Sequence, residues 1–513
     1  MLTARLRIST WLLLGWCAFI ASWILVNRAK EPMCLLGWTR CGEDLWLEPG
    51  SSRPIAAVGV AGVVVLLVLW WLEGRREKVK VDALAARTVR PVVLGVLSFV
   101  GVLGAAHLML FAPVDDKLPC GEPIRINAVL AYPLNCDSGL FMELAHNPGD
   151  ILEPNSVRQS RPGYVALGAA ATAVIGPIAE WAGLNDLYAQ DDTAFIPLVL
   201  INFVIGALAL ALFVWLMLRL GAPPGVTLPL AAIFAINDVT KAYYWSPHQQ
   251  MFSLLVPIGT ILVCRWLLLR RPSWRQVGVL ALGLGLIALV YGSVLITVAA
   301  AGLVLLWSAW TNRRQHDGER AANRTRATAT VIGKVLLLGA IAAVPTAAWM
   351  AICRAVTGTY YNHEVVVYRQ FVWIPESARE GWAVLREKVA NASAMTAIQM
   401  IEVTWLLSAV LVILAIAAVL ARVGLGPVTA EHRAVLIGTA LTGVLTLIFL
   451  WGMGLWAYRL TFHIVPVFLV AIGWVSTRLS VLSARAALAT QIFLGLLAAA
   501  WVAFQLVSHG PYS

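Results

Sequence analysis

The sequence predicts an all-α polytopic membrane protein with about 13 transmembrane helices. Of its 513 residues, 60% are hydrophobic and only 13% are charged, whereas soluble domains average about 25% charged residues. Mean hydropathy is +0.79. Apolar runs of about 18 or more residues recur along the whole chain, as expected for membrane-spanning helices. We therefore predict a multi-pass protein of the plasma (inner) membrane.

Basic residues orient the predicted helices. The net charge of +11 arises mainly in short loops beside helix ends, which the positive-inside rule places in the cytoplasm. This distribution, without a nucleic-acid-binding motif, argues against nucleic acid as a partner. The N-terminus is then cytoplasmic, and the first apolar run is a retained helix rather than a cleaved signal peptide. The basic clusters lie at residues 75–80, 270–275, 313–326, 422–433 and 478–485.

One apolar segment, residues 163–181, breaks this pattern. If it crossed the membrane, the basic clusters at 270–275 and 313–326 would face outward. We therefore expect it to lie at the outer interface or to re-enter the membrane without crossing. Spans are predicted at 10–27, 54–74, 90–112, 196–218, 224–240, 250–270, 277–292, 294–311, 330–353, 402–422, 434–454, 459–477 and 487–508.

These spans divide the chain into four parts. Residues 1–89 hold two N-terminal transmembrane helices, and residues 90–353 form a central transmembrane module that includes an outer loop at 113–195. Residues 354–401 form a second outer loop, which we expect to be mobile. Residues 402–513 supply the C-terminal transmembrane helices.

Four cysteines lie in predicted outer loops. Cys34 and Cys41 share one loop, and Cys120 and Cys136 share another. Disulfides form in an oxidising compartment, so two disulfides are expected if these loops face outward. The alternative is four unpaired thiols.

The first large outer loop carries the main chemical candidates. Asp137 precedes a short segment whose residues Leu140, Phe141, Leu144 and Ala145 share one helical face, which predicts an amphipathic helix resting on the bilayer. A carboxylate at that position can simply cap the helix. Farther along the loop, an arginine can reach lipid headgroups or grip a specific phosphate through its planar guanidinium group; the candidates are Arg158 and Arg161.

The order of these features resembles the GT-C glycosyltransferases, which are integral membrane enzymes that use lipid-linked sugar donors. Asp137 stands where the family has the first acid of its outer loop, Glu143 where it has a later Glu, and Arg161-Pro162 where it often has Lys-Pro. Ser138 replaces the family's second acid, and two extra spans precede the usual first helix. The resemblance covers about thirty residues of motif and implies a GT-C-like module with interfacial helices in its outer loop.

The resemblance also implies a mechanism. A sugar on a polyprenyl phosphate has a good leaving group, whereas an acceptor hydroxyl needs a general base, and Asp137 is the candidate. One-step displacement would invert the anomeric carbon. Cations must hold the phosphate as its charge grows, and the candidates for that role are Arg158, Arg161, Lys241, Arg369 and Arg459.

Other polar residues are candidate substrate contacts. His248 and Gln249 follow an aromatic run whose rings at 243–245 are better explained as a headgroup belt. His363 and Glu364 in the second outer loop could contact substrate or a divalent metal, although no ligand spacing supports a metal site. Arg459 and His463 lie one helical turn apart and could clamp the lipid phosphate or anchor a helix.

The sequence therefore predicts a membrane glycosyltransferase with its active site outside the cytoplasm and no cofactor. Its expected partners are a polyprenyl-phosphate sugar, a cell-envelope glycan or glycolipid acceptor, and membrane lipids. The Ala-, Val- and Arg-rich composition is typical of bacteria of high genomic GC content. A lipid or glycan transporter or flippase without enzymatic activity is the alternative, although ionisable residues are nearly absent from the middle of the spans, where transporters usually carry them.

Overall fold

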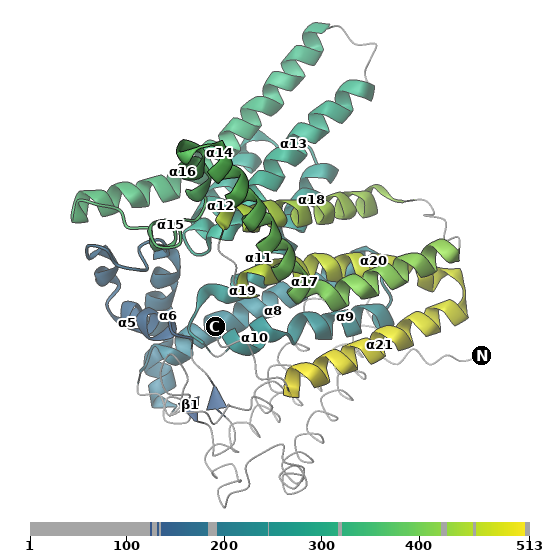
Figure 1. Cartoon of the computed structure of the whole chain (residues 1–513), viewed down its shortest axis with the longest axis horizontal. Helices are drawn as coiled ribbons and strands as arrows, with labels where there is room; N and C mark the ends of the chain where they lie inside the picture. The colour runs from purple at the N-terminus through teal and green to yellow at the C-terminus, as the bar shows by residue number, and fades with distance from the viewer. Residues whose placement is uncertain are drawn as a thin grey trace, which may run out of the picture.

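A computed structural model describes residues 124–125, 131–132, 135–182, 192–244, 246–315, 321–421, 428–454 and 458–507. The predicted spans at 10–27, 54–74 and 90–112 lie outside these residues, as do Cys34, Cys41 and Cys120. The described part is almost entirely helical (Figure 1). It contains nine helices that are long and apolar enough to cross a membrane, so it has the architecture of a multi-pass membrane protein.

The first half of the described chain contains a two-residue hairpin and the helices that follow it. The hairpin pairs β1 (Ile124–Arg125) with β2 (Ala131–Tyr132). The helices are α5 (Ser138–His146), η1 (Pro148–Leu152), α6 (Pro162–Trp181), α8 (Phe195–Arg219), α9 (Pro224–Ala235), α10 (Asp238–Tyr243), η2 (Gln249–Met251), α11 (Phe252–Leu269), α12 (Trp274–Ala288), η3 (Gly292–Val294) and α13 (Leu295–Gln315).

The second half begins with a long helix and returns through the bundle. Its elements are α14 (Ala321–Thr357), α15 (His363–Val366), α16 (Trp373–Glu380), α17 (Trp382–Leu420), α18 (Ala430–Met453), α19 (Tyr458–Thr461), η4 (Phe462–Ile464), α20 (Val465–Leu482) and α21 (Ala484–Val507).

Ten predicted spans fall on described residues, and each coincides with helix, but two are shorter than expected. The span predicted at 224–240 is split, because Asn237 accepts a hydrogen bond from the Thr240 amide and starts α10 as a new helix. The span predicted at 277–292 ends at Ala288. At 15 residues, α12 is about 22 Å long, which is less than the roughly 30 Å thickness of the hydrocarbon core.

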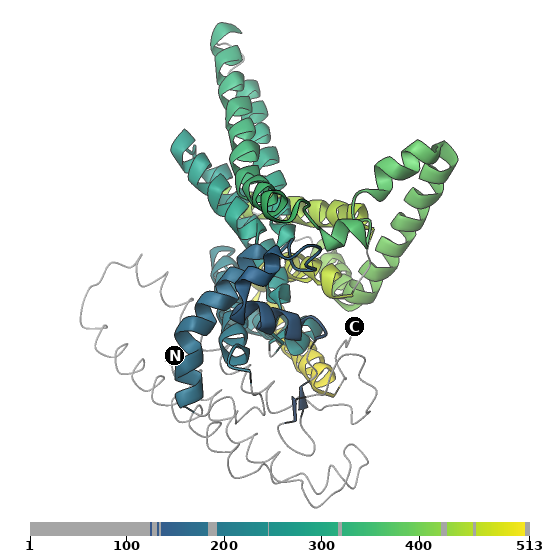
Figure 2. The same cartoon turned by 90° about the vertical axis from the view of Figure 1, so that its left-hand side faces the viewer.

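The loop predicted at 354–401 is shorter than expected. Helix α14 continues to Thr357, and α17 begins at Trp382, so much of the segment 354–401 is helical. Figure 2 shows α16 and the start of α17 projecting from the bundle as an arm. At 39 residues, α17 is about 58 Å long and exceeds the thickness of a bilayer.

Helix α6 has the length and composition of a span, but its direction differs from that of its neighbours. Helices α8, α20 and α21 run roughly alongside one another, whereas α6 runs across them at one end of the bundle (Figures 1 and 2). Several of its apolar side chains are exposed, including Val174, Ile178 and Trp181. The placement of this helix at the membrane interface, which the charge pattern favours, stays a prediction.

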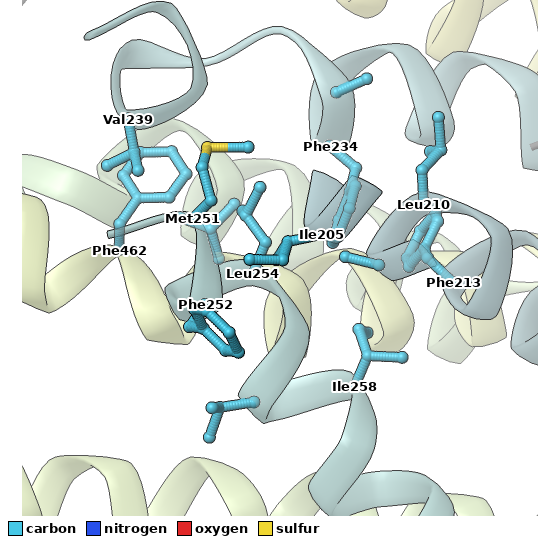
Figure 3. Packing of buried hydrophobic residues seen from close by; sticks show 14 of the residues in the cluster. Ile205, Leu210, Phe213, Phe234, Val239, Met251, Phe252, Leu254, Ile258 and Phe462 are labelled. Atoms are coloured by element: carbon cyan, nitrogen blue, oxygen red, sulfur yellow. The ribbon is translucent and has the colours of Figure 1, made fainter. Parts of the chain in front are cut away.

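The main apolar core joins α8, α9, α11 and α20 beneath the polar end of the bundle. Phe213 and Phe234 stack with ring centroids 4.8 Å apart. Val239, Met251 and Phe462 belong to the same cluster (Figure 3). Because each of these three lies within a few residues of a polar candidate, the core holds the candidate site on a rigid base.

Helices α12 and α14 pack closely at Gly285. A Cβ atom there would lie 2.5 Å from the Ala342 carbonyl oxygen. Gly285→Ala should therefore destabilise the protein by about 1–3 kcal/mol, the usual cost of overpacking. Gly283→Ala is the matched control, because nothing lies within 4 Å of its added Cβ. Thermal unfolding in detergent measures both variants, and equal stability of the two would contradict this packing.

Candidate functional site

Asp137 lies at the N-terminus of α5, but it is not the helix cap that the alternative interpretation required. Its side chain makes no capping hydrogen bond. Instead its carboxylate forms an ion pair with the guanidinium group of Arg158, and Oδ2 lies 3.2 Å from Nε2 of His248. Asp137 is 27% exposed, so a molecule in solvent can still reach it.

Helix α5 packs into the protein rather than resting on the bilayer. Phe141, Leu144 and Ala145 are buried, and the Phe141 ring meets Tyr164 of α6 edge to face at 4.8 Å. The Arg158 guanidinium group lies 4.9 Å from the centroid of the same ring. The expected apolar face therefore exists, but its partner is protein, and it helps to hold Arg158 beside Asp137.

The hydrogen bonds of His248 determine its tautomer. Its Nδ1 accepts a hydrogen bond from the Gln250 backbone amide at 3.0 Å. A neutral imidazole has one donor and one acceptor nitrogen, so Nε2 carries the proton and donates to Asp137. Burial lowers the pKa of His248 to about 4, and the ring is therefore neutral at pH 7.

The environment keeps Asp137 ionised. Burial alone would raise its pKa, but the hydrogen bond from His248 and the charges of Arg158 and Arg459 together hold the pKa well below its ordinary value. The resting carboxylate is consequently a stable anion and a weak base. Its proton affinity would rise if a neighbouring cation turned to another anion.

Arg459 reaches the same site through Tyr243. Its Nη1 donates to the Tyr243 hydroxyl at 3.0 Å, and Nδ2 of Asn135 donates to that hydroxyl at 3.2 Å. The Arg459 backbone carbonyl accepts from Nε2 of Gln250 at 2.8 Å. The segments around residues 135, 243–250 and 459 therefore converge, although they are more than one hundred residues apart in sequence.

A second ion pair lies beside the first. Arg161 Nη2 is 2.9 Å from Oε1 of Glu364, whose Oε2 accepts from the Ser160 hydroxyl at 2.7 Å. Burial would raise the pKa of Glu364, but Arg161 and Ser160 hold it below its ordinary value. The Tyr361 amide also donates to Oε1 of Gln159 at 2.7 Å, so residues 159–161 bind the segment that carries α15.

Several candidate residues lie elsewhere or have different partners. Glu143 is exposed on α5, and Arg369 pairs with Glu376. His363 contacts the Tyr361 hydroxyl through Nδ1 at 3.0 Å. Gln249 is buried, and it is its neighbour Gln250 that contacts His248 and Arg459. Lys241 lies on α10, but its side chain is outside what the structure describes.

His463 hydrogen-bonds to protein groups through both ring nitrogens. Its Nδ1 faces the Leu460 carbonyl oxygen at 2.7 Å, and Nε2 lies 3.0 Å from the Ser293 hydroxyl. The ring is buried and stacks on Tyr291 with a centroid distance of 5.6 Å. Its role here is to position the segment 291–293, which lies beside Arg161.

Sequence reasoning missed Tyr243 and Asn135 as site residues. The sequence favoured a headgroup belt for Tyr243, and its position in a run of aromatic and polar residues is the only sequence signal that it carries. The structure shows its hydroxyl accepting hydrogen bonds from two side chains. A contact between segments so far apart in one sequence cannot be predicted from residue spacing.

The described part of this loop contains neither a metal-binding cluster nor a free thiol. Among the described residues, no group of three or more His, Cys, Asp or Glu side chains lies close enough to hold a metal ion. Cys136 is disulfide-bonded, and its partner lies outside the described residues, since Cys264 and Cys353 are free. The specific pairings of Cys120 with Cys136 and of Cys34 with Cys41 stay predictions.

Comparison with known proteins assigns no family. No protein-family model matches the chain, and no curated protein matches it.

Protonation of His248 should make the stability of the folded protein depend on pH. Its pKa of about 4 in the folded protein is below the ordinary value of 6.5, so the unfolded state binds more protons between these values. Stability should therefore fall as the pH drops from about 6.5 towards 4. His248→Gln should show a smaller fall, measured as melting temperature in detergent at about pH 7.5 and 5.

His146→Gln is the control for this measurement, because it removes a histidine whose side chain is 38% exposed. An identical loss of stability in the wild type and in His248→Gln would show that His248 does not titrate as proposed.

Proposed function

We propose that this protein is a membrane glycosyltransferase of the GT-C kind, which transfers a sugar from a polyprenyl-phosphate donor to an acceptor outside the cytoplasm. One observation carries the proposal: Asp137, Arg158, His248 and Arg459 converge from distant segments on a partly exposed site at one end of an apolar helix bundle. Such a site gives a lipid-borne phosphate and a water-borne hydroxyl access to the same carboxylate.

The charges of the site favour an anionic ligand. Arg158, Arg161 and Arg459 supply three positive charges, Asp137 and Glu364 supply two negative charges, and His248 is neutral at pH 7. The net charge is +1. A preorganised excess of positive charge in a half-buried site stabilises a phosphate whose negative charge grows as its bond to the sugar breaks.

The Asp137–Arg158 ion pair suggests how the base is activated. In the resting state Arg158 neutralises Asp137 and weakens it as a base. When Arg158 turns to the donor phosphate, Asp137 loses that cation and its proton affinity rises. The acceptor oxygen then attacks the anomeric carbon, its proton passes to Asp137, and the bond between that carbon and the phosphate oxygen breaks to release polyprenyl phosphate.

His248 is a positioning residue in this scheme. Its Nε2–H donates to one carboxylate oxygen of Asp137, which leaves the other oxygen to Arg158 in the resting state and to the acceptor hydroxyl during reaction. Since the Gln250 amide occupies Nδ1, the imidazole cannot easily reverse its tautomer. The carboxylate is therefore held in one orientation.

Removal of the base is the first test of this proposal. Asp137→Asn should lower transfer from labelled polyprenyl-phosphate sugars by at least about 100-fold, since general base catalysis contributes roughly 10²–10⁴. Glu143→Gln is the control, because Glu143 is an exposed acid on the same short helix and its loss should leave transfer unchanged. Undiminished transfer by folded Asp137→Asn would remove Asp137 from the mechanism.

The phosphate role of Arg161 can be tested separately. Arg161→Ala should raise the KM for the lipid donor by about 10-fold or more, the effect of losing a charge-assisted hydrogen bond, and should raise the KM for the acceptor less. Arg369→Ala is the control, because Arg369 is an outer arginine that pairs with Glu376 away from Asp137. A larger effect on the acceptor than on the donor would assign Arg161 to the acceptor instead.

A further inference from the structure

We propose that the opposite end of the bundle carries a second, separate site, which binds a phosphate anion through Arg219, Arg265 and Arg478. Nothing in the glycosyl-transfer scheme uses these residues. They come from three different helices and gather around the start of a fourth, α18.

The position of the cluster follows from helix geometry. Arg265 lies on α11 fifteen residues after Gln250, and Arg478 lies on α20 fifteen residues after His463. At 1.5 Å per residue, both are about 22 Å from the Asp137 end. Arg219 is the last residue of its candidate span, and Arg265 and Arg478 each lie four residues before the end of theirs. This depth corresponds to the lipid headgroups if these helices cross the membrane.

One acidic side chain holds two of the arginines. Glu431 Oε1 lies 2.7 Å from Nη2 of Arg265 and 3.8 Å from Nε of Arg219. Helices α11 and α18 approach closely enough for this contact because Gly438 has no side chain, and a Cβ there would lie 3.1 Å from the Ile261 carbonyl oxygen. Both guanidinium groups also lie 5.0 Å from the Trp215 ring centroid.

The third arginine joins the cluster through a second tryptophan. The Arg478 guanidinium group lies 4.2 Å from the centroid of the Trp474 ring, and the His432 ring lies 5.1 Å from the same centroid. Because His432 follows Glu431 on α18, the first turn of that helix lies beside all three arginines: Glu431 pairs with Arg219 and Arg265, and His432 and Arg478 contact the same Trp474 ring.

The hydrogen bonds of this set are incomplete. Nε and Nη2 of Arg478, Nε of Arg265 and Nδ1 of His432 are buried and have no partner among the described residues. Buried donors of charged groups without a partner are costly. Among the described residues, Glu431 is the one acid that pairs with any of these three arginines. The three arginines and Glu431 together therefore carry a net charge of +2. A phosphate between Arg265 and Arg478 would supply acceptors and negative charge at once.

Simple extension of the arginines into headgroups does not account for this arrangement. An arginine that merely reaches for water keeps its guanidinium group free, whereas Arg265 is only 18% exposed and is held between Glu431 and Trp215. Trp215 and Glu431 together hold the guanidinium group of Arg265 in place. Fixed guanidinium groups are suited to a phosphate, which they can bind with two hydrogen bonds each.

The ligand is a phosphate group, and it can come from an anionic lipid headgroup or from inorganic phosphate. Two arms of one experiment separate these sources. In the first, the intact protein is exchanged into micelles that contain phosphatidylglycerol and phosphatidylcholine, and native mass spectrometry counts retained lipids. In the second, inorganic phosphate is added to protein in phosphatidylcholine alone, and the melting temperature is measured.

We expect the wild type to retain phosphatidylglycerol over phosphatidylcholine. Arg265→Gln and Arg478→Gln should each reduce that retention about five-fold, the effect of one basic residue at an anionic lipid surface. Arg379→Gln is the control, because Arg379 is exposed on α16 at the other end of the bundle, and its loss should change nothing. If inorganic phosphate raises the melting temperature and Arg478→Gln abolishes the rise, the site exists and takes free phosphate.

The inference is overturned if the wild type neither prefers phosphatidylglycerol nor is stabilised by inorganic phosphate, an outcome that needs no variant to fold. It is also overturned if Arg379→Gln reduces binding as much as Arg478→Gln. Arg478→Lys keeps the positive charge and controls for misfolding of Arg478→Gln. It should retain more lipid than Arg478→Gln. None of these measurements depends on sugar transfer, so the site and the proposed enzyme can fail independently.

Discussion

The ion pair between Asp137 and Arg158 is the interaction on which the polar end of the bundle depends. A half-buried charge is costly unless an opposite charge and hydrogen bonds compensate it. Asp137 receives both only because the loop after η1 returns Arg158 to it and the segment before α11 presents His248. The arrangement of α5, α6 and α11 is thus coupled to the ionisation of one carboxylate.

The same compensation limits what Asp137 can do at rest. Cations and a hydrogen bond that stabilise an anion also lower its proton affinity, so the geometry that builds the site also restrains the proposed base. In the proposed mechanism, ligand binding redistributes the arginines before proton transfer to Asp137. Arg161 is restrained in a parallel way by Glu364, and two inward-facing ion pairs of this kind can exchange their partners for a phosphate.

Helices α11 and α20 connect the two polar ends of the molecule. Each follows directly on a short helix beside the Asp137 site, η2 with Gln250 or η4 with His463, and each carries an arginine of the second cluster near its other end. Between those ends the buried side chains are mainly apolar, with hydroxyls that bond within the bundle, such as Thr260 to Thr297 at 2.7 Å. Charge therefore gathers where water or headgroups can solvate it, which suits chemistry at a surface.

The sequence by itself determined the membrane class, the approximate place of ten described helices, and the polar residues worth testing, because hydropathy and charge asymmetry are local properties that act over one helix length. It also predicted Arg158, Arg161, His248, Glu364 and Arg459 as candidates. Only the tertiary structure decided which of them meet. It left Glu143 exposed on α5, paired Arg369 with Glu376, engaged His463 with Ser293, and brought in Tyr243 and Asn135. Contacts between segments separated by one hundred residues depend on how helices pack, and spacing along the chain does not encode them.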